Sequence, residues 1–263
     1  MALNFDAGAS AYDRFMGRWS RLYLPALLAS AEVTGGQRVL DVATGTGEAA
    51  LMAASLVGQT GRVVGVDISL PMLRQARARS AGTPITLAVG DALALPFRDG
   101  AFEAVICQLG LMLVPDPRRA AREFRRVLRP RGRVAVCVWS TADRMPLIGL
   151  LAAALSRHLP ALRDVLFQGC SLGEAGRLEQ LLVGAGFRDV HVTRDTRELV
   201  FGSAEDFWAP VEAGGARLGQ AYRELPAEAR RAVFEEVRAR VTAFESRGRI
   251  VMEAEALCGV ASG

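Results

Sequence analysis

The fold of this chain is decided by residues 39–48, which read Val39-Leu40-Asp41-Val42-Ala43-Thr44-Gly45-Thr46-Gly47-Glu48. An apolar run with one acid leads into a glycine turn, and a helix begins directly after the turn. Gly45 and Gly47 let the backbone approach a ligand closely and adopt φ values that other residues avoid. The turn also fits the pattern G-x-G-x-x-A, since Ala50 follows Gly47 at the required spacing. The stretch therefore predicts a nucleotide-type site between a strand and a helix.

Strands and helices alternate on the C-terminal side of this turn. We expect strands at 38–43, 63–67, 85–89, 102–109 and 133–139, with helices at 48–56, 71–80 and 117–128 between them. Strands that are apolar on both faces and alternate with helices indicate a parallel sheet covered on both sides. The sequence thus predicts an α/β protein with a doubly wound, Rossmann-like sheet, whose ligands bind beyond the carboxyl ends of the strands.

The two ends of the chain depart from this alternation. Residues 9–30 are predicted to be helical, and the chain after Trp139 predicts helices at 146–158, 174–185 and across 203–245, with strands at 189–201 and 250–260. We therefore expect one domain over residues 1–263. It comprises an N-terminal helical segment (1–30), a ligand-binding core (31–140) and two helical cap insertions (141–186 and 203–247).

Acids follow three successive predicted strands, at Asp41, Asp67 and Asp91. Asp67 is suited to accept both hydroxyls of a ribose, while Asp91 and the Ala92 amide suit the amino group and a ring nitrogen of adenine. Unpaired acids at buried strand ends cost stability, so a purely structural origin for all three is disfavoured. Ile68 and Met72 are placed to flank the adenine, although a core role is equally compatible with both.

Charge separates two cofactors that this turn could accept. A dinucleotide brings an anionic pyrophosphate to the helix N-terminus, where Asp41 and Glu48 would repel it. The same acids suit a sulfonium and an α-amino group, which favours S-adenosylmethionine, with S-adenosylhomocysteine as product. Glu48 can equally be a favourable acid in the first turn of a helix. An NAD-dependent oxidoreductase is therefore disfavoured but stays open.

The chain resembles the class I methyltransferases of the ubiquinone and menaquinone C-methyltransferase type. The resemblance rests on the turn at 39–47 and on four further segments, 65–67, 90–92, 95–97 and 127–133. It implies a seven-stranded sheet with the last strand antiparallel. By the same resemblance, the methionine part lies on Asp41, Thr44, Gly45 and Gly47, the ribose on Asp67, the adenine on Asp91 and Ala92, and Gln108 lines the floor between donor and acceptor.

The characteristic acidic and aromatic substrate motifs of the quinone enzymes are not evident after Trp139, so the acceptor is left open. Aromatic residues favour a small, largely apolar acceptor, a phenol, quinol or polyketide, methylated at carbon or oxygen. Tyr12, Trp19 and Trp139 are candidates for its pocket, with core packing as the alternative. His158 is the candidate base, against a surface or capping role.

Composition excludes or disfavours several classes of function. The chain has no lysine, which excludes Schiff-base chemistry, and its four cysteines (Cys107, Cys137, Cys170 and Cys258) form no C-x-x-C pair, so no metal site is expected. The net charge is +4, but arginines mix with acids on helical faces, so no nucleic-acid partner is expected, and nucleic-acid methylation is the second alternative. A protein that binds S-adenosylmethionine without transferring methyl is a third. Without a membrane-length apolar run or a signal peptide, we expect a cytoplasmic protein, of undetermined oligomeric state.

Overall fold

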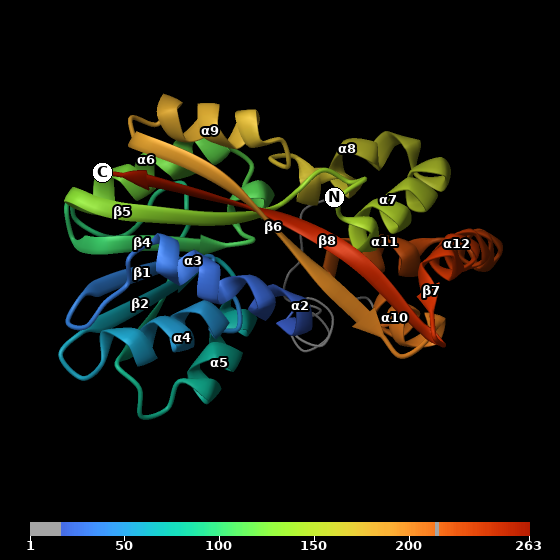
Figure 1. Cartoon of the computed structure of the whole chain (residues 1–263), viewed down its shortest axis with the longest axis horizontal. Helices are drawn as coiled ribbons and strands as arrows, with labels where there is room; N and C mark the ends of the chain where they lie inside the picture. Colours follow the sequence, from blue (N-terminus) through green and yellow to red (C-terminus); the bar gives the residue numbers. More distant parts are fainter. Residues whose placement is uncertain (1–16, 214–215) are drawn as a thin grey trace.

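A twisted mixed sheet runs through the middle of the molecule in the computed structural model, which describes residues 17–213 and 216–263 (Figure 1). Across the sheet the main strands lie in the order β3 (Ile85–Val89), β2 (Arg62–Asp67), β1 (Arg38–Val42), β4 (Phe102–Gln108), β5 (Leu128–Trp139), β8 (Arg249–Ser262) and β6 (Arg188–Phe201). The first five are parallel, as predicted from their apolar faces. This confirms the Rossmann-like class.

Strand β8 is the antiparallel strand, and it lies between β5 and β6 rather than at an edge. Its pairing with β5 ends at Ala256, whereas its pairing with β6 continues to Ile250. A two-stranded ribbon therefore projects beyond the sheet toward the helices in orange and red in Figure 1. The short strand β7 (Glu245–Ser246) pairs with the start of β8.

Helices cover both faces of the sheet because each presents small or aliphatic residues to it. On one face lie α3 (Leu24–Ser30), α4 (Glu48–Val57) and α5 (Leu70–Arg79), and on the other α6 (Pro117–Val127) and α9 (Ala175–Gly184) (Figure 1). Helix α9 falls in the range predicted for the cap, but it packs on β6, β8 and α6 and so belongs to the sheet layers.

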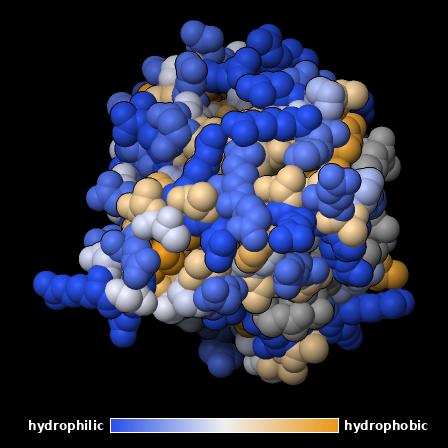
Figure 2. All heavy atoms as spheres, turned by 90° about the vertical axis from the view of Figure 1, so that its right-hand side faces the viewer, coloured by the Kyte–Doolittle hydropathy of each residue, from blue (hydrophilic) through white to orange (hydrophobic). Residues whose placement is uncertain are grey.

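The other late helices gather around the ribbon. They are α7 (Pro146–His158), α8 (Arg163–Leu166), α10 (Ala204–Glu212), α11 (Ala216–Glu224) and α12 (Ala227–Val241), with 3₁₀ turns η5 (Pro160–Leu162), η6 (Gln168–Cys170) and η7 (Thr242–Phe244). Their aromatic side chains interlock, with Trp208 packed edge-on against Tyr222 and Phe234. Figure 2 shows mostly hydrophilic side chains on the outer face of this layer. Among the described residues, no helix is long and apolar enough to span a membrane.

The N-terminal segment joins the core to this helical layer. Helix α2 (Arg18–Ser20) and the 3₁₀ turn η3 (Arg21–Tyr23) lead into α3. Trp19 packs on Phe201 at the end of β6, with ring centroids 4.9 Å apart, and Tyr23 meets the ring of Trp139 edge-on at 5.4 Å. Trp19 and Tyr23 are therefore buried, Trp19 against the ribbon and Tyr23 against the end of β5.

The segment between α6 and β5 differs from expectation. We predicted that the helix ends at Leu128 and that the strand begins at Arg133; instead the helix ends at Val127, and β5 already starts at Leu128. Arg131 adopts a φ of 66°, and the pairing register with β4 shifts in this region. An irregular strand accommodates Pro130 and Gly132 at the end of the sheet.

A buried carboxylate fixes the end of β5 to β8. The side chain of Glu255 is only 5% exposed, and its Oε1 accepts a hydrogen bond from Ser140 Oγ at 2.6 Å. Arg194 and Arg144 form ion pairs with the two carboxylate oxygens at 2.5 and 3.3 Å. Removing this acceptor would leave the buried Ser140 hydroxyl with only a longer hydrogen bond, of 3.4 Å, to the Gly173 carbonyl.

We expect Glu255→Ala to lower the free energy of unfolding by about 1.5–3 kcal/mol, the range for hydrogen bonds to charged groups. Glu253→Ala is the matched control, because Glu253 is an exposed acid on the same strand. Denaturant unfolding of both variants measures the difference. Equal effects at the two positions would show that the buried network contributes no specific stability.

Candidate active site

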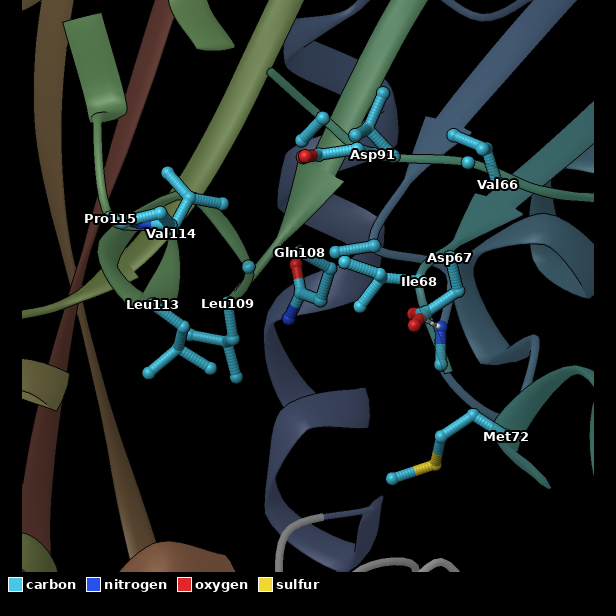
Figure 3. A pocket seen from close by; sticks show the side chains of 16 residues that line it. Val66, Asp67, Ile68, Met72, Asp91, Gln108, Leu109, Leu113, Val114 and Pro115 are labelled. Carbon is cyan, nitrogen blue, oxygen red and sulfur yellow. Dashed lines mark hydrogen bonds between the residues drawn. The ribbon is translucent and has the colours of Figure 1, made fainter. Parts of the chain in front are cut away.

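A pocket of about 240 Å³ opens at the carboxyl ends of the parallel strands. It is lined by Val42, Ala43, Gly45, Val66, Asp67, Ile68, Met72, Gly90, Asp91, Ala92, Gln108, Leu109, Gly110, Leu113, Val114 and Pro115. In Figure 3, Asp67, Ile68 and Met72 lie on one side, the residues after β4 lie on the other, and Gln108 stands between them. Every lining residue comes from the core rather than from the helical layer around the ribbon.

Most of the residues predicted to hold the donor meet at this pocket. Those that line it are Gly45, Asp67, Ile68, Met72, Asp91, Ala92 and Gln108. Asp41 and Thr44 are buried behind the glycine turn, and Gly47 packs against Ala76 of α5. Residues that are far apart in the sequence therefore lie together at the carboxyl ends of the strands.

Asp67 ties the first two strand ends together. Its Oδ2 accepts a hydrogen bond from the Gly45 amide and its Oδ1 one from the Ser69 amide, both at 2.8 Å. Asp67 also lines the pocket, where its carboxylate faces the space open to a ligand. Asp67 therefore both shapes the glycine turn and presents charge to the pocket.

Asp41 is fully buried directly behind the turn. Its Oδ2 accepts a hydrogen bond from Thr44 Oγ1 at 2.6 Å, while its Oδ1 has no hydrogen-bond partner. Burial, together with the nearby charge of Asp67, raises the pKa of the Asp41 carboxyl to about 7, against the hydrogen bond from Thr44. A buried carboxylate oxygen without a hydrogen-bond donor lowers the stability of the fold, and such groups call for a specific explanation, for example a ligand that supplies the donor.

Apolar side chains and a second acid also line the pocket beside Asp67. The Ile68 side chain is 65% exposed, unusual for a large aliphatic residue, whereas Met72 is buried beneath it in α5. The Asp91 carboxylate accepts a hydrogen bond from the Leu93 amide at 2.9 Å and is otherwise exposed. An apolar surface with a few polar groups is typical of small-molecule pockets.

Gln108 ends β4 at the middle of the pocket. Its Nε2 donates to the Ser20 carbonyl at 3.0 Å, which fixes the orientation of the amide and links the pocket to α2. The opposite atom, Oε1, is buried without a hydrogen-bond partner. An acceptor atom therefore sits unsatisfied at the floor of the site.

The wall after β4 was not assigned to the site from the sequence. Leu109, Gly110, Leu113, Val114 and Pro115 form it, partly through the 3₁₀ turn η4 (Leu111–Leu113). The signal was available, because this segment directly follows a strand at the carboxyl edge of the sheet. Gln168 of η6 holds the wall by donating from Nε2 to the Leu113 carbonyl at 3.2 Å.

Two of the six described non-glycine residues with a positive φ lie at the same edge. Ala43 and Leu109 follow neighbouring strands, line the pocket, and adopt φ values of 57° and 56°. Left-handed backbone at residues other than glycine is uncommon and clusters at functional sites. A Cβ on Gly110 would lie 2.5 Å from the Ala43 Cβ, so only glycine lets these two loops approach.

The prediction that the Glu48 carboxylate is unpaired at the turn is wrong. Glu48 Oε1 is paired with Arg21 Nη2 at 2.8 Å and with Arg79 Nη1 at 2.6 Å. The two guanidinium groups neutralise the carboxylate, so Glu48 does not repel an anion in the way the bare sequence suggested. The preference against a pyrophosphate then rests on Asp41 and Asp67.

The acceptor and base candidates do not gather at this pocket. Trp139 and Trp19 are buried in the core contacts with Tyr23 and Phe201 described above. His158 is exposed at the C-terminal end of α7 and is not a lining residue. Tyr12 lies outside the described residues. The sequence does not show how the late strands fold back, and the packing of Trp19 and Trp139 against Phe201 and Tyr23 keeps both tryptophans out of the pocket lining.

The cysteines behave as core residues where the structure describes them. Cys107 and Cys137 are buried, and burial raises the pKa of the Cys107 thiol to about 12. Within residues 17–213 and 216–263, no group of three or more histidine, cysteine, aspartate or glutamate side chains is placed to hold a metal ion.

Comparison with known proteins decides the family. A family model described as a methyltransferase domain matches residues 40–136, which contain the glycine turn and the strand-end acids. The demethylmenaquinone methyltransferase of Thermobifida fusca is 35% identical over 168 residues, covering 61% of this chain and 70% of that protein. The chain is a member of the class I S-adenosylmethionine-dependent methyltransferase family. The predictions of this donor and of a methyltransferase are thereby confirmed.

Two further matches show how far the similarity extends. The demethylmenaquinone methyltransferase of Clavibacter sepedonicus is 38% identical over 149 residues, which cover 55% of this chain but only 59% of that relative. A Haemonchus contortus phosphoethanolamine N-methyltransferase, solved with phosphomonomethylethanolamine and S-adenosylhomocysteine, has a TM-score of 0.62 at 21% identity, covering 98% of this chain and 57% of that one. The likeness to the Haemonchus enzyme is one of fold alone. The methyl acceptors in these names are those of the related proteins.

Proposed function

We propose that this methyltransferase methylates a small, largely apolar acceptor, a phenol, quinol or polyketide-like molecule, at carbon or oxygen. The observation that carries the proposal is the division of the pocket into two unlike sides. One side combines acids and the glycine turn with Ile68 and Met72, whereas Leu109, Leu113, Val114 and Pro115 form an apolar wall without any charged group on the other. Such a wall favours an apolar ring as the second ligand.

The donor would occupy the acidic side. Asp67 would hold the ribose and Asp91 with the Ala92 amide the adenine, between Ile68 and Met72. The unpartnered Asp41 Oδ1 behind the turn fits the cationic amino acid end of the donor. When bound, S-adenosylmethionine supplies an electrophilic methyl group, whose bond to sulfur breaks as the bond to the acceptor atom forms.

The chain itself contributes position and water exclusion. Holding two reactants in line can lower a barrier by roughly 7–11 kcal/mol, and an apolar wall keeps water from the reacting atoms. No histidine is among the described lining residues. The proposal therefore favours an acceptor that is already ionised or that reacts through an electron-rich carbon.

Calorimetric titration with S-adenosylhomocysteine, with NADH titrated in parallel, tests the donor half of the proposal. We expect micromolar binding of S-adenosylhomocysteine and no binding of NADH, because two acids face the turn where a pyrophosphate would lie. Tight NADH binding by a folded protein that ignores S-adenosylhomocysteine would overturn the proposal.

Turnover then tests the acceptor half. The methyltransferase is incubated with S-adenosylmethionine and each of a set of phenols, quinols and polyketides, and S-adenosylhomocysteine release is measured. Methyl transfer to apolar ring compounds, and none to oligonucleotides, is the expected result. Transfer to oligonucleotides alone, or donor binding without any transfer, would contradict it.

A further inference from the structure

We infer that Arg21 binds the α-carboxylate of S-adenosylmethionine, exchanging its ion pair with Glu48 for one with the donor. The inference rests on the proposed donor site and adds a residue from outside the core of the fold. It identifies what the N-terminal segment contributes to recognition of the donor. Arg21 was not among the residues predicted for the site.

The position of Arg21 is fixed from two sides. Its chain neighbour Ser20 accepts a hydrogen bond from Gln108, which lines the pocket. Its guanidinium pairs with Glu48, the first residue of α4 after the glycine turn. Arg18, one turn earlier, anchors the segment to the ribbon and α10 by donating to the Val200 carbonyl and pairing with Asp206. Arg21 is thus held beside the turn that takes the methionine end of the donor.

An arginine would complete the charge match at this end. The amino acid end of the donor carries an ammonium and a carboxylate, so an anionic group and a cationic group complement it better than the backbone amides of the turn alone. Asp41 offers an unpartnered oxygen for the cation. For the anion, the described residues around the turn provide two guanidinium groups, those of Arg21 and Arg79, on a single carboxylate of Glu48.

Of these two arginines, Arg79 is the one committed to the protein. Its Nη1 also donates to the Thr46 carbonyl and hydroxyl oxygens, at 3.4 and 3.2 Å, which holds it under the turn. The Arg21 side chain is 47% exposed, so it can turn toward a ligand at little cost in packing. When Arg21 leaves, Glu48 remains neutralised by Arg79.

A pair of ligands and a pair of variants test this inference by binding alone. The ligands are S-adenosylhomocysteine and its decarboxylated analogue, which keeps the amine and the nucleoside. The variants are Arg21→Gln and Glu48→Gln, which break the same ion pair from opposite ends. Affinities come from calorimetry, with thermal unfolding as the check that each variant is folded.

We expect the unaltered protein to prefer S-adenosylhomocysteine over the analogue by about 10- to 150-fold, the range for a charge-assisted hydrogen bond. Arg21→Gln should lose most of this preference, and Glu48→Gln should keep it, because Arg21 is still present. Loss in both variants would show a purely structural role for the ion pair, and preference retained in Arg21→Gln would also overturn the inference. Failure of the unaltered protein to bind either ligand would instead refute the proposed donor site.

Discussion

Asp67→Ala is expected to weaken S-adenosylhomocysteine binding by about 10- to 150-fold, corresponding to about 1.5–3 kcal/mol for a lost charge-assisted hydrogen bond. Asp67 faces the pocket and also accepts the amides of Gly45 and Ser69 at 2.8 Å. The alanine variant therefore loses a ligand partner and the group that draws the glycine turn toward the second strand. Both losses act on the same ligand.

Two further variants separate these contributions. Asp67→Asn keeps one acceptor oxygen of similar shape but removes the charge, so it should recover part of the affinity. Asp99→Ala is the control, because Asp99 is an exposed acid paired with Arg126 away from the pocket. Calorimetry measures the affinities, and thermal unfolding confirms the fold. Unchanged affinity in a folded Asp67→Ala protein would remove Asp67 from the site.

The sequence allowed the sheet to be predicted because its strands carry an unusually clear signal. Strands such as β1 and β4 are buried on both faces, and continuous apolar runs of this kind occur where helices cover both sides. The path of β8 was not derivable from periodicity, because a strand between two others looks the same as a strand at the edge. Its antiparallel orientation came from the family resemblance alone.

The donor side of the site was predictable for a related reason. Acids such as Asp67 and Asp91 are conspicuous when they end apolar strands, and parallel strands bring their carboxyl ends to one edge. The apolar wall after β4 carries no such contrast, because Leu113 and Val114 look like core residues in the sequence. Pairing between distant side chains, as between Arg21 and Glu48, depends on how the N-terminal segment crosses the core, which local patterns do not encode.

Asp41→Asn is expected to stabilise the unliganded protein at neutral pH while weakening its affinity for S-adenosylhomocysteine. In the folded protein, burial raises the pKa of Asp41 from its ordinary 3.8 to about 7. Between these two values the unfolded chain has lost this proton and the folded protein still holds it. The contribution of Asp41 to stability is therefore fully present below about pH 3.8 and is lost as the pH rises to 7.

The variant lacks this titration, so its stability relative to the unaltered protein should rise between pH 4 and pH 8, by about 2–4 kcal/mol. Denaturant unfolding across that range measures the difference, with Asp164→Asn, the same substitution at an exposed position on α8, as the control. The affinity of the unaltered protein for S-adenosylhomocysteine should improve toward pH 7, because only the ionised carboxylate attracts the ligand's ammonium group. Parallel pH profiles for the variant and the unaltered protein would show that Asp41 neither titrates in this range nor contributes its charge to the ligand.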